Sequence, residues 1–182
     1  MPAPTPTPSV YSARAVLAHW ITAALVLVLW VFGRNLDLFP HGDIRMQARS
    51  VHMLFGLVVL AVILERIWRR FHHPVAPPHG SPQWANRAAA LMHLALYILV
   101  LAVIVVGLGT EWARGDRIFG LFKVTAFDPT HPAVRREWGD VHGLLANILL
   151  CLALAHAFAA VAHEFVWRDG VLSRMIPALR RT

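Results

Sequence analysis

The apolar run from Trp138 to His163 constrains the fold of this chain more than any other stretch. As one helix it is long enough to cross a bilayer core of about 30 Å, and it carries His142 and His156. The interval between these two residues turns an α-helix by about 1400°, so the rings lie ~40° apart on one face and roughly 21 Å apart along the axis. Such a helix can carry two stacked metal centres, one near each membrane surface.

Three further apolar runs, at residues 15–33, 51–68 and 88–110, are also long enough to span a bilayer. Apolar residues make up 57% of the chain and the mean hydropathy is +0.54, which is more apolar surface than a soluble domain of this length can bury. The lone Cys151 excludes a disulfide framework within one chain. We therefore predict an all-α integral membrane protein, a four-helix up-down bundle.

The spans divide the chain into three parts. Residues 1–11, with four prolines among the first ten, are expected to be a disordered lead-in. Residues 12–170 form the bundle, whose first helix begins near Ser12, and residues 171–182 form a basic tail that lies on anionic headgroups. A cleaved signal peptide is the competing interpretation of the first run, but that run is long for one and lacks a clear cleavage site.

Helix-breaking residues, chiefly Pro and Gly, and charged residues predict where the connections between spans lie. Residues 34–50 are a polar connection, residues 69–87 a proline-rich loop, and residues 111–137 a longer polar loop. Its apolar patch at 118–122 is too short to span and is expected at the membrane interface. We predict that five histidines are solvated in these loops: His41, His72, His73, His79 and His131.

The charge pattern argues for a membrane partner and against nucleic acid. The net charge is +7, but Lys and Arg stand at the ends of apolar runs, where they anchor to lipid headgroups. Four spans put both termini on one side with the 69–87 loop. That side carries nine of the 17 basic residues and the other side eight, so the positive-inside rule favours cytoplasmic termini.

Depth in the bilayer pairs the histidines that lie inside the spans. His19 enters from the cytoplasmic side and His156 comes out near it, whereas His52 and His142 each begin a span at the outer face. We therefore predict two bis-histidine sites, His19 with His156 on the inside and His52 with His142 on the outside. The competing interpretation, for any one histidine alone, is a hydrogen bond to a neighbouring helix.

Small neighbours favour a flat macrocycle over a bare ion at these sites. Gly56 lies one turn from His52, and Gly139 and Ala146 lie one turn from His142. Zinc asks for three or four ligands in one cluster, and the spacing offers none. Bis-histidine iron, held as two haem b groups, suits electron transfer because no coordination position stays open for substrate.

Several histidines and their neighbours form a pattern that extends over positions 12–177. The pattern consists of His19-Trp20, His52, His93 with Tyr97, His142-x-x-x-Ala-Asn, and His156-Ala-x-Ala-Ala-x-Ala-His163-x-x-x-Trp-Arg-Asp. It resembles the bacterial cytochrome b561 family, specifically in the last span and more loosely in the loops. The resemblance implies a dihaem cytochrome of the bacterial inner membrane that exchanges electrons with the quinone pool.

The length is similar to that of the compact members of the family, which implies an enzyme that oxidises periplasmic superoxide and reduces ubiquinone. On this hypothesis Arg45, Arg49, Arg135 and Arg136 attract superoxide at the outer face, although seven acids share that side and keep the field local. His93, His163 and Arg14 are candidates for contacts with quinone or with haem propionates. For the two histidines, structural hydrogen bonding is the competing role.

Two other functions stay open on the sequence. One is an electron-transfer subunit or partner that links the quinone pool to another redox protein. The other is a haem-free transporter or scaffold, which would be colourless. The sequence does not fix the direction of electron flow or the oligomeric state.

Overall fold

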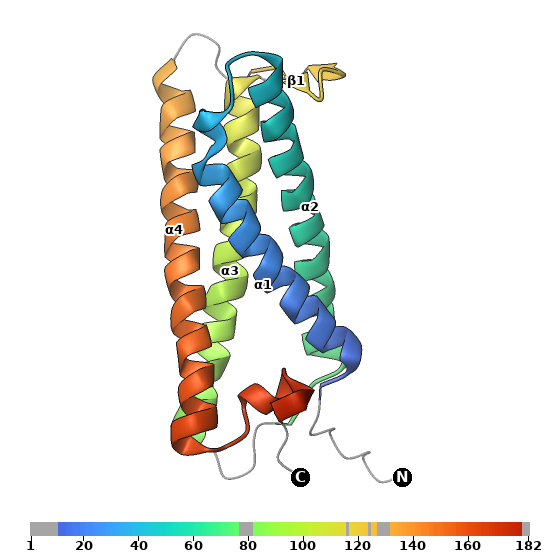
Figure 1. The fold of residues 1–182 in the computed structure, drawn as a ribbon, viewed down its shortest axis with the longest axis vertical. Helices are drawn as coiled ribbons and strands as arrows, with labels where there is room; N and C mark the ends of the chain where they lie inside the picture. Colours follow the sequence, from blue (N-terminus) through green and yellow to red (C-terminus); the bar gives the residue numbers. More distant parts are fainter. Residues whose placement is uncertain (1–10, 77–81, 116, 124, 127–131, 180–182) are drawn as a thin grey trace.

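Four long helices run up and down through the protein in the computed structural model, which describes residues 11–76, 82–115, 117–123, 125–126 and 132–179. They are α1 (Ala13–Arg34), α2 (Asp43–His72), α3 (Gln83–Arg114) and α4 (Pro132–Ala162) (Figure 1). Each is long and apolar enough to cross a membrane, α4 together with the turn that follows it. The predicted four-span, all-α fold is confirmed.

The bundle has two unlike ends. The beginning of α1, the end of α2, the beginning of α3 and the end of α4 lie at one end, which we call the terminal end (Figure 1). At the opposite end, the hairpin end, β1 (Arg117–Ile118) pairs antiparallel with β2 (Phe122–Lys123). A hydrogen bond from the Phe119 amide to the Ser50 hydroxyl, at 2.9 Å, ties this hairpin to α2. The apolar patch expected at the interface, residues 118–122, is therefore part of a small hairpin and runs from Ile118 in β1 through the turn to Phe122 in β2.

The interior of the bundle is narrow. Val59, Ile63, Val100 and Leu149 form its buried cluster, from α2, α3 and α4. Many large apolar side chains point outward, and Phe158 is 79% exposed. An exposed apolar surface of this extent suits lipid contact, because lipid tails are as apolar as the side chains they touch.

Two contacts join neighbouring helices closely. The Trp30 indole N–H on α1 donates to the Asn147 side-chain oxygen on α4 at 2.9 Å. A Cβ added to Gly109 on α3 would lie 2.3 Å from the Trp138 ring on α4, so only glycine lets these helices approach so closely. Trp138 therefore packs between α3 and α4.

The helices extend beyond the apolar runs, so the predicted connections were too long. α2 begins at Asp43 and not at 51, because Gly42 at φ +95° breaks the chain and a carboxylate favours a helix N-terminus. α3 continues to Arg114 and ends at the left-handed Gly115, and α4 begins at Pro132. His72, predicted in a loop, is the last residue of α2; His79 and His131 lie outside the described residues.

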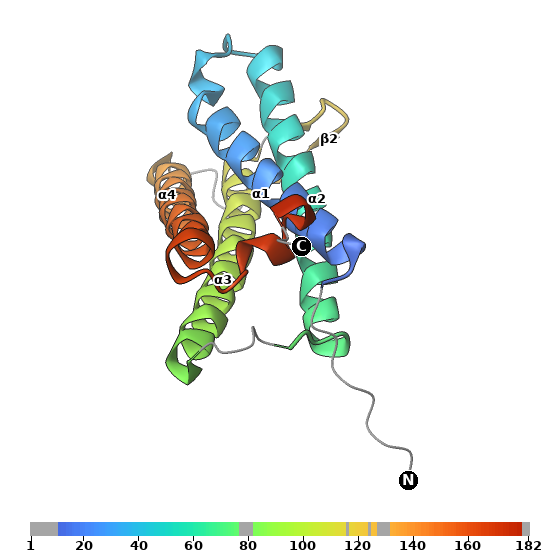
Figure 2. The ribbon, with the colours of Figure 1, turned by 60° about the horizontal axis from the view of Figure 1, so that its bottom comes forward.

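The segment after α4 folds back across the terminal end (Figure 2). A π-helical turn, η2 (His163–Trp167), leads into two short 3-10 turns, η3 (Leu172–Arg174) and η4 (Pro177–Leu179). The Trp20 indole N–H donates to the Met175 carbonyl at 3.0 Å, and Arg174 donates to the Ala76 carbonyl at 2.8 Å. The segment expected as a basic tail is thus packed against the bundle as far as Leu179.

Candidate functional site

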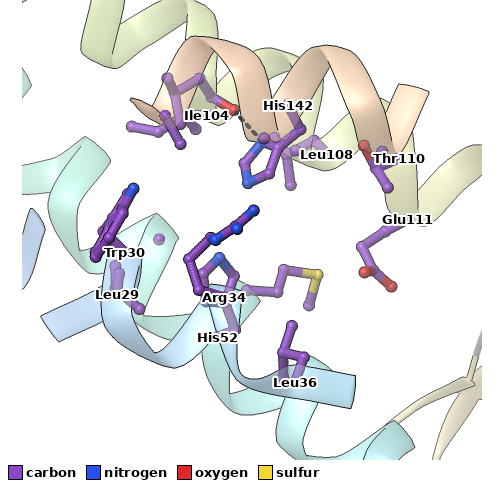
Figure 3. A pocket seen from close by; sticks show the side chains of 18 of the residues that line it. Leu29, Trp30, Arg34, Leu36, His52, Ile104, Leu108, Thr110, Glu111 and His142 are labelled. Carbon is purple, nitrogen blue, oxygen red and sulfur yellow. Dashed lines mark hydrogen bonds between the residues drawn. The ribbon is translucent and has the colours of Figure 1, made fainter. Parts of the chain in front are cut away.

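At the hairpin end, His52 on α2 and His142 on α4 face one another across a cavity of about 690 Å³ (Figure 3). Their ring centroids are 6.2 Å apart and their planes are inclined by 81°. The cavity is lined by residues of all four helices, among them Trp30, Gly56, Gly107 and Asn147. The volume lies within the range typical of ligand and cofactor sites.

The Nδ1 atoms of these two rings differ in their hydrogen bonding. The Nδ1–H of His142 donates to the Val103 carbonyl at 3.0 Å, which leaves the lone pair on Nε2 for a ligand. Nδ1 of His52 is buried and has no hydrogen-bond partner among the described residues. Burying a polar atom without a hydrogen-bond partner costs free energy, so we infer that His52 has a role besides packing.

Glycines make room for the rings and for what lies between them. A Cβ on Gly33 would lie 3.1 Å from Cε1 of His52, and one on Gly107 would lie 2.9 Å from Cε1 of His142. Gly56 and Gly143 also line the cavity, but a Cβ on either would meet nothing within 4 Å. Gly33 and Gly107 therefore pack closely against the two rings, while the open space at Gly56 and Gly143 leaves room for a flat group.

At the terminal end, His19 on α1 and His156 on α4 form a second facing pair. Their ring centroids are 6.3 Å apart, with planes inclined by 64°. His93 on α3 joins them, its centroid 5.2 Å from that of His156. The members of each pair that depth in the bilayer predicted thus lie close together, while their role as ligands stays a prediction.

The separation of the rings in both pairs suits one metal ion between them. Two imidazoles that each bind a metal through a nitrogen at about 2 Å have ring centroids roughly 6 Å apart. Both facing pairs match this value, whereas His93 and His156 are closer, as in direct ring contact. Within the described residues, no group of three or more His, Cys, Asp or Glu side chains could hold a bare metal ion. The residues therefore fit an iron macrocycle with two axial histidines.

Arg66 on α2 is a residue at the terminal end that the sequence assigned only to membrane anchoring. Its guanidinium donates to Nδ1 of His19 at 3.3 Å and lies 5.6 Å from the centre of the Tyr97 ring. A guanidinium can only donate, so Nδ1 of His19 accepts this hydrogen bond, whereas Nδ1 of His142 donates. The signal was present in the sequence, because Arg66 follows His52 by the same interval that separates His142 from His156.

The other candidates at this end lie in different surroundings. His163, in the π-helical turn, donates from Nδ1 to the Asp169 carboxylate at 2.6 Å. Arg14 is exposed in the first turn of α1. The sequence indicated His163 as a candidate but not Asp169. The π-helical turn brings Asp169 to His163, and hydropathy does not predict this turn.

The cations expected to attract superoxide all lie at the hairpin end but in unequal settings. Arg135 and Arg136 are exposed residues that line the cavity, together with Arg34 and Arg114. Arg45 is held by the Phe39 carbonyl and by Asp37 at 3.3 Å. Arg49 lies on α2, in the part predicted as a connection. Acids share the cavity wall: Asp37, Glu111 and Asp140.

Comparison with known proteins identifies the family. The sequence profile of the prokaryotic cytochrome b561 family matches residues 10–178. Cytochrome b561 homolog 1 of Escherichia coli K12 is 30% identical over 177 residues, which cover 92% of this chain and 97% of that protein. Cytochrome b562 of Cereibacter sphaeroides is 31% identical over 173 residues, covering 91% and 94%. The probable superoxide oxidase CybB of Yersinia pestis is 27% identical over 176 residues, covering 93% and 97%.

The profile match covers most of the chain, so this chain belongs to the prokaryotic cytochrome b561 family. It is accordingly a multi-pass protein of a bacterial membrane that takes part in electron transfer, and the family implies that it binds haem b.

Proposed function

We propose that this member of the prokaryotic cytochrome b561 family oxidises superoxide at the outer face of the bacterial inner membrane and reduces ubiquinone. The terminal end then lies in the cytoplasm and the hairpin end faces the periplasm. The observation that carries the proposal is the pair of facing histidine sites, one at each end of a membrane-spanning bundle. Two such sites provide a route for electrons across the bilayer.

Four histidines would hold two haem b groups, His52 with His142 and His19 with His156. Haem bound in this way supplies a one-electron carrier that has no open position for substrate. The chain contributes the orientation of the ligands: the Val103 carbonyl holds His142 with its Nε2 free, and Gly33 and Gly107 let the rings of His52 and His142 lie close to α1 and α3.

The overall reaction balances over two superoxide anions. Each gives up one electron and leaves as O₂, and ubiquinone takes up two electrons and two protons. Oxidation of superoxide needs no proton donor, but quinone reduction does, and His93, His163 and Arg14 at the terminal end are candidates for quinone contact. At the hairpin end, Arg135 and Arg136 face the cavity mouth, while Arg45 and Arg49 add positive charge farther along α2.

The relative named as a probable superoxide oxidase supports this substrate, at 27% identity. Two other relatives are named only as cytochromes. That naming favours a second candidate, an electron-transfer subunit that links the quinone pool to another redox protein. The exposed Leu121 and Phe122 of the hairpin are available for such a partner.

Two measurements test the proposal. The reduced-minus-oxidised visible spectrum of the purified protein should contain paired b-type bands, and a spectrum without them contradicts both candidates. Stopped-flow mixing of quinone-loaded protein with superoxide should then reduce the haem bands faster than superoxide dismutates unaided. Slower reduction, combined with co-purification of a soluble redox subunit, would favour the second candidate.

A further inference from the structure

The residues that follow α4 form an arrangement that the haem sites do not use. Nδ1–H of His163 donates to one carboxylate oxygen of Asp169 at 2.6 Å, and the amide of Val171 donates to the other oxygen at 3.3 Å. Both side chains are partly buried, at 29% exposed for His163 and 18% for Asp169. The carboxylate therefore holds the imidazole at its Nδ1 edge, while 29% of the His163 side chain remains exposed.

The backbone here is shaped to bring these two side chains together. The chain leaves α4 through a π-helical turn, and Arg168 then adopts a left-handed conformation at φ +55°. The Asp169 amide closes the turn on the His163 carbonyl at 3.2 Å. π-Helical turns and left-handed non-glycine residues are costly and are concentrated at functional sites. A plain continuation of α4 would carry Asp169 away from His163.

The neighbouring acid Glu164 is engaged elsewhere. It is 6% exposed, and one of its carboxylate oxygens accepts the Ser173 amide at 3.0 Å. Glu164 thus fixes the fold-back segment at the terminal end (Figure 2), whereas Asp169 is the carboxylate that bonds to His163. The two acids have separate tasks, which makes Glu164 a matched control for Asp169.

From this geometry we infer that Asp169 is a positioning residue and that His163, held by it, gives protons to the quinone at the terminal end. The inference rests on the proposed function. A carboxylate bonded to Nδ1–H fixes the tautomer of the imidazole and stabilises the imidazolium, so Nε2 is the nitrogen that gives and takes the proton. His163 passes one proton from Nε2 to a quinone oxygen and takes another from cytoplasmic water. Two such transfers accompany the two electrons released by two superoxide anions, and Asp169 keeps its charge throughout.

The test uses haem-loaded protein that has been reduced chemically and is then mixed with a soluble short-chain ubiquinone. Reoxidation of the haem bands is followed by stopped flow, in H₂O and in D₂O. Asp169→Asn keeps a hydrogen-bond acceptor but removes the charge. It should lower the maximal rate about tenfold or more and raise the solvent isotope effect, with little change in the quinone concentration at half-maximal rate. Asp169→Glu should restore part of the rate.

Two further variants separate positioning from folding. Glu164→Gln keeps an acceptor for the Ser173 amide and should react like the unmodified protein. The double variant Asp169→Asn with His163→Gln should be no slower than His163→Gln alone, because Asp169 acts through His163. Independent losses in the double variant, or an unchanged rate and isotope effect in Asp169→Asn, would overturn the inference. Failure of the unmodified protein to react with quinone would instead overturn the proposed function.

Discussion

At the hairpin end a backbone carbonyl, that of Val103, holds the His142 ring, whereas at the terminal end a guanidinium, that of Arg66, holds the His19 ring. The carbonyl accepts a hydrogen bond from Nδ1–H of His142 and leaves the Nε2 lone pair free, while the guanidinium donates a hydrogen bond to Nδ1 of His19. The hairpin-end site is therefore preorganised by the fold itself. The terminal-end site depends on a side chain, has a permanent positive charge beside it and includes a third histidine, His93.

The largest expected effect comes from removing one ligand at each end in turn. His142→Ala should lose only the hairpin-end haem and His156→Ala only the terminal-end haem, so each variant should retain about half of the haem because each metal needs both axial rings. Haem content per protein and the split of the b-type bands provide the measurement. Loss of both haems in either variant would show that the two ends do not form independent sites.

A second test fills the open space at the hairpin end without touching the ligands. A Cβ on Gly56 meets nothing within 4 Å, so Gly56→Leu should leave the cofactor-free fold intact but exclude the macrocycle from the hairpin-end site. Binding titrations with haem should then saturate near one equivalent. Cys151→Ser, at an exposed position on α4, serves as the control and should bind haem like the unmodified protein.

A third test addresses the charge beside the terminal-end pair. Arg66→Gln removes a cation that stabilises an added electron nearby, so the reduction potential of the terminal-end haem should fall while that of the hairpin-end haem stays nearly constant. A spectroelectrochemical titration resolves the two potentials. Arg66→Lys keeps the charge and should recover most of the potential; equal shifts at both ends would contradict the assignment of Arg66 to one site.

A smaller effect is expected from the cations at the cavity mouth. Exposed charges act through a screened field, so the double variant Arg135→Gln with Arg136→Gln should slow reaction with superoxide about tenfold at low salt, and less at high salt. Arg45→Gln should change the rate less, because Arg45 is already paired with Asp37. Stopped-flow rates over a series of salt concentrations measure both, and a salt-independent loss would argue against attraction.

The smallest effect concerns the contact between the helices that separate the two ends. Trp30→Phe removes the hydrogen bond to Asn147 and should lower stability by about 1 kcal/mol, because interhelical hydrogen bonds in membranes are typically worth ~0.6–2 kcal/mol. Unfolding in a detergent and denaturant series measures the change. Because Trp30 and Asn147 also line the hairpin-end cavity, a shift in the haem bands without a loss of stability would show that this contact shapes that site and does not hold the helices together.

Much of the fold followed from hydropathy, because the four apolar runs must cross the membrane as helices and the up-down order fixes the depth of each histidine. The ends of the helices did not follow, since Asp43 and Pro132 begin helices in polar sequence that only capping and packing stabilise. The proximity of His52 to His142 was predictable from depth alone.

The residues that surround the pairs were harder to predict. Arg34 and Arg66 resemble ordinary anchoring cations until their neighbours are known. Asp169 contacts His163 because of a π-helical turn, and the spacing of apolar residues does not predict such a turn. Contacts of this kind depend on side-chain direction, which the spacing of residues along a helix does not give.

The bond between Trp20 and the Met175 carbonyl joins positions 155 residues apart. During synthesis this contact can therefore form only after Met175 has left the ribosome, long after α1 has been made. All the residues described at the hairpin-end cavity are made by Leu149, well before that point. The two ends thus differ in their order of synthesis, because every residue described at the hairpin-end cavity is made before Met175, whose carbonyl accepts the Trp20 hydrogen bond at the terminal end.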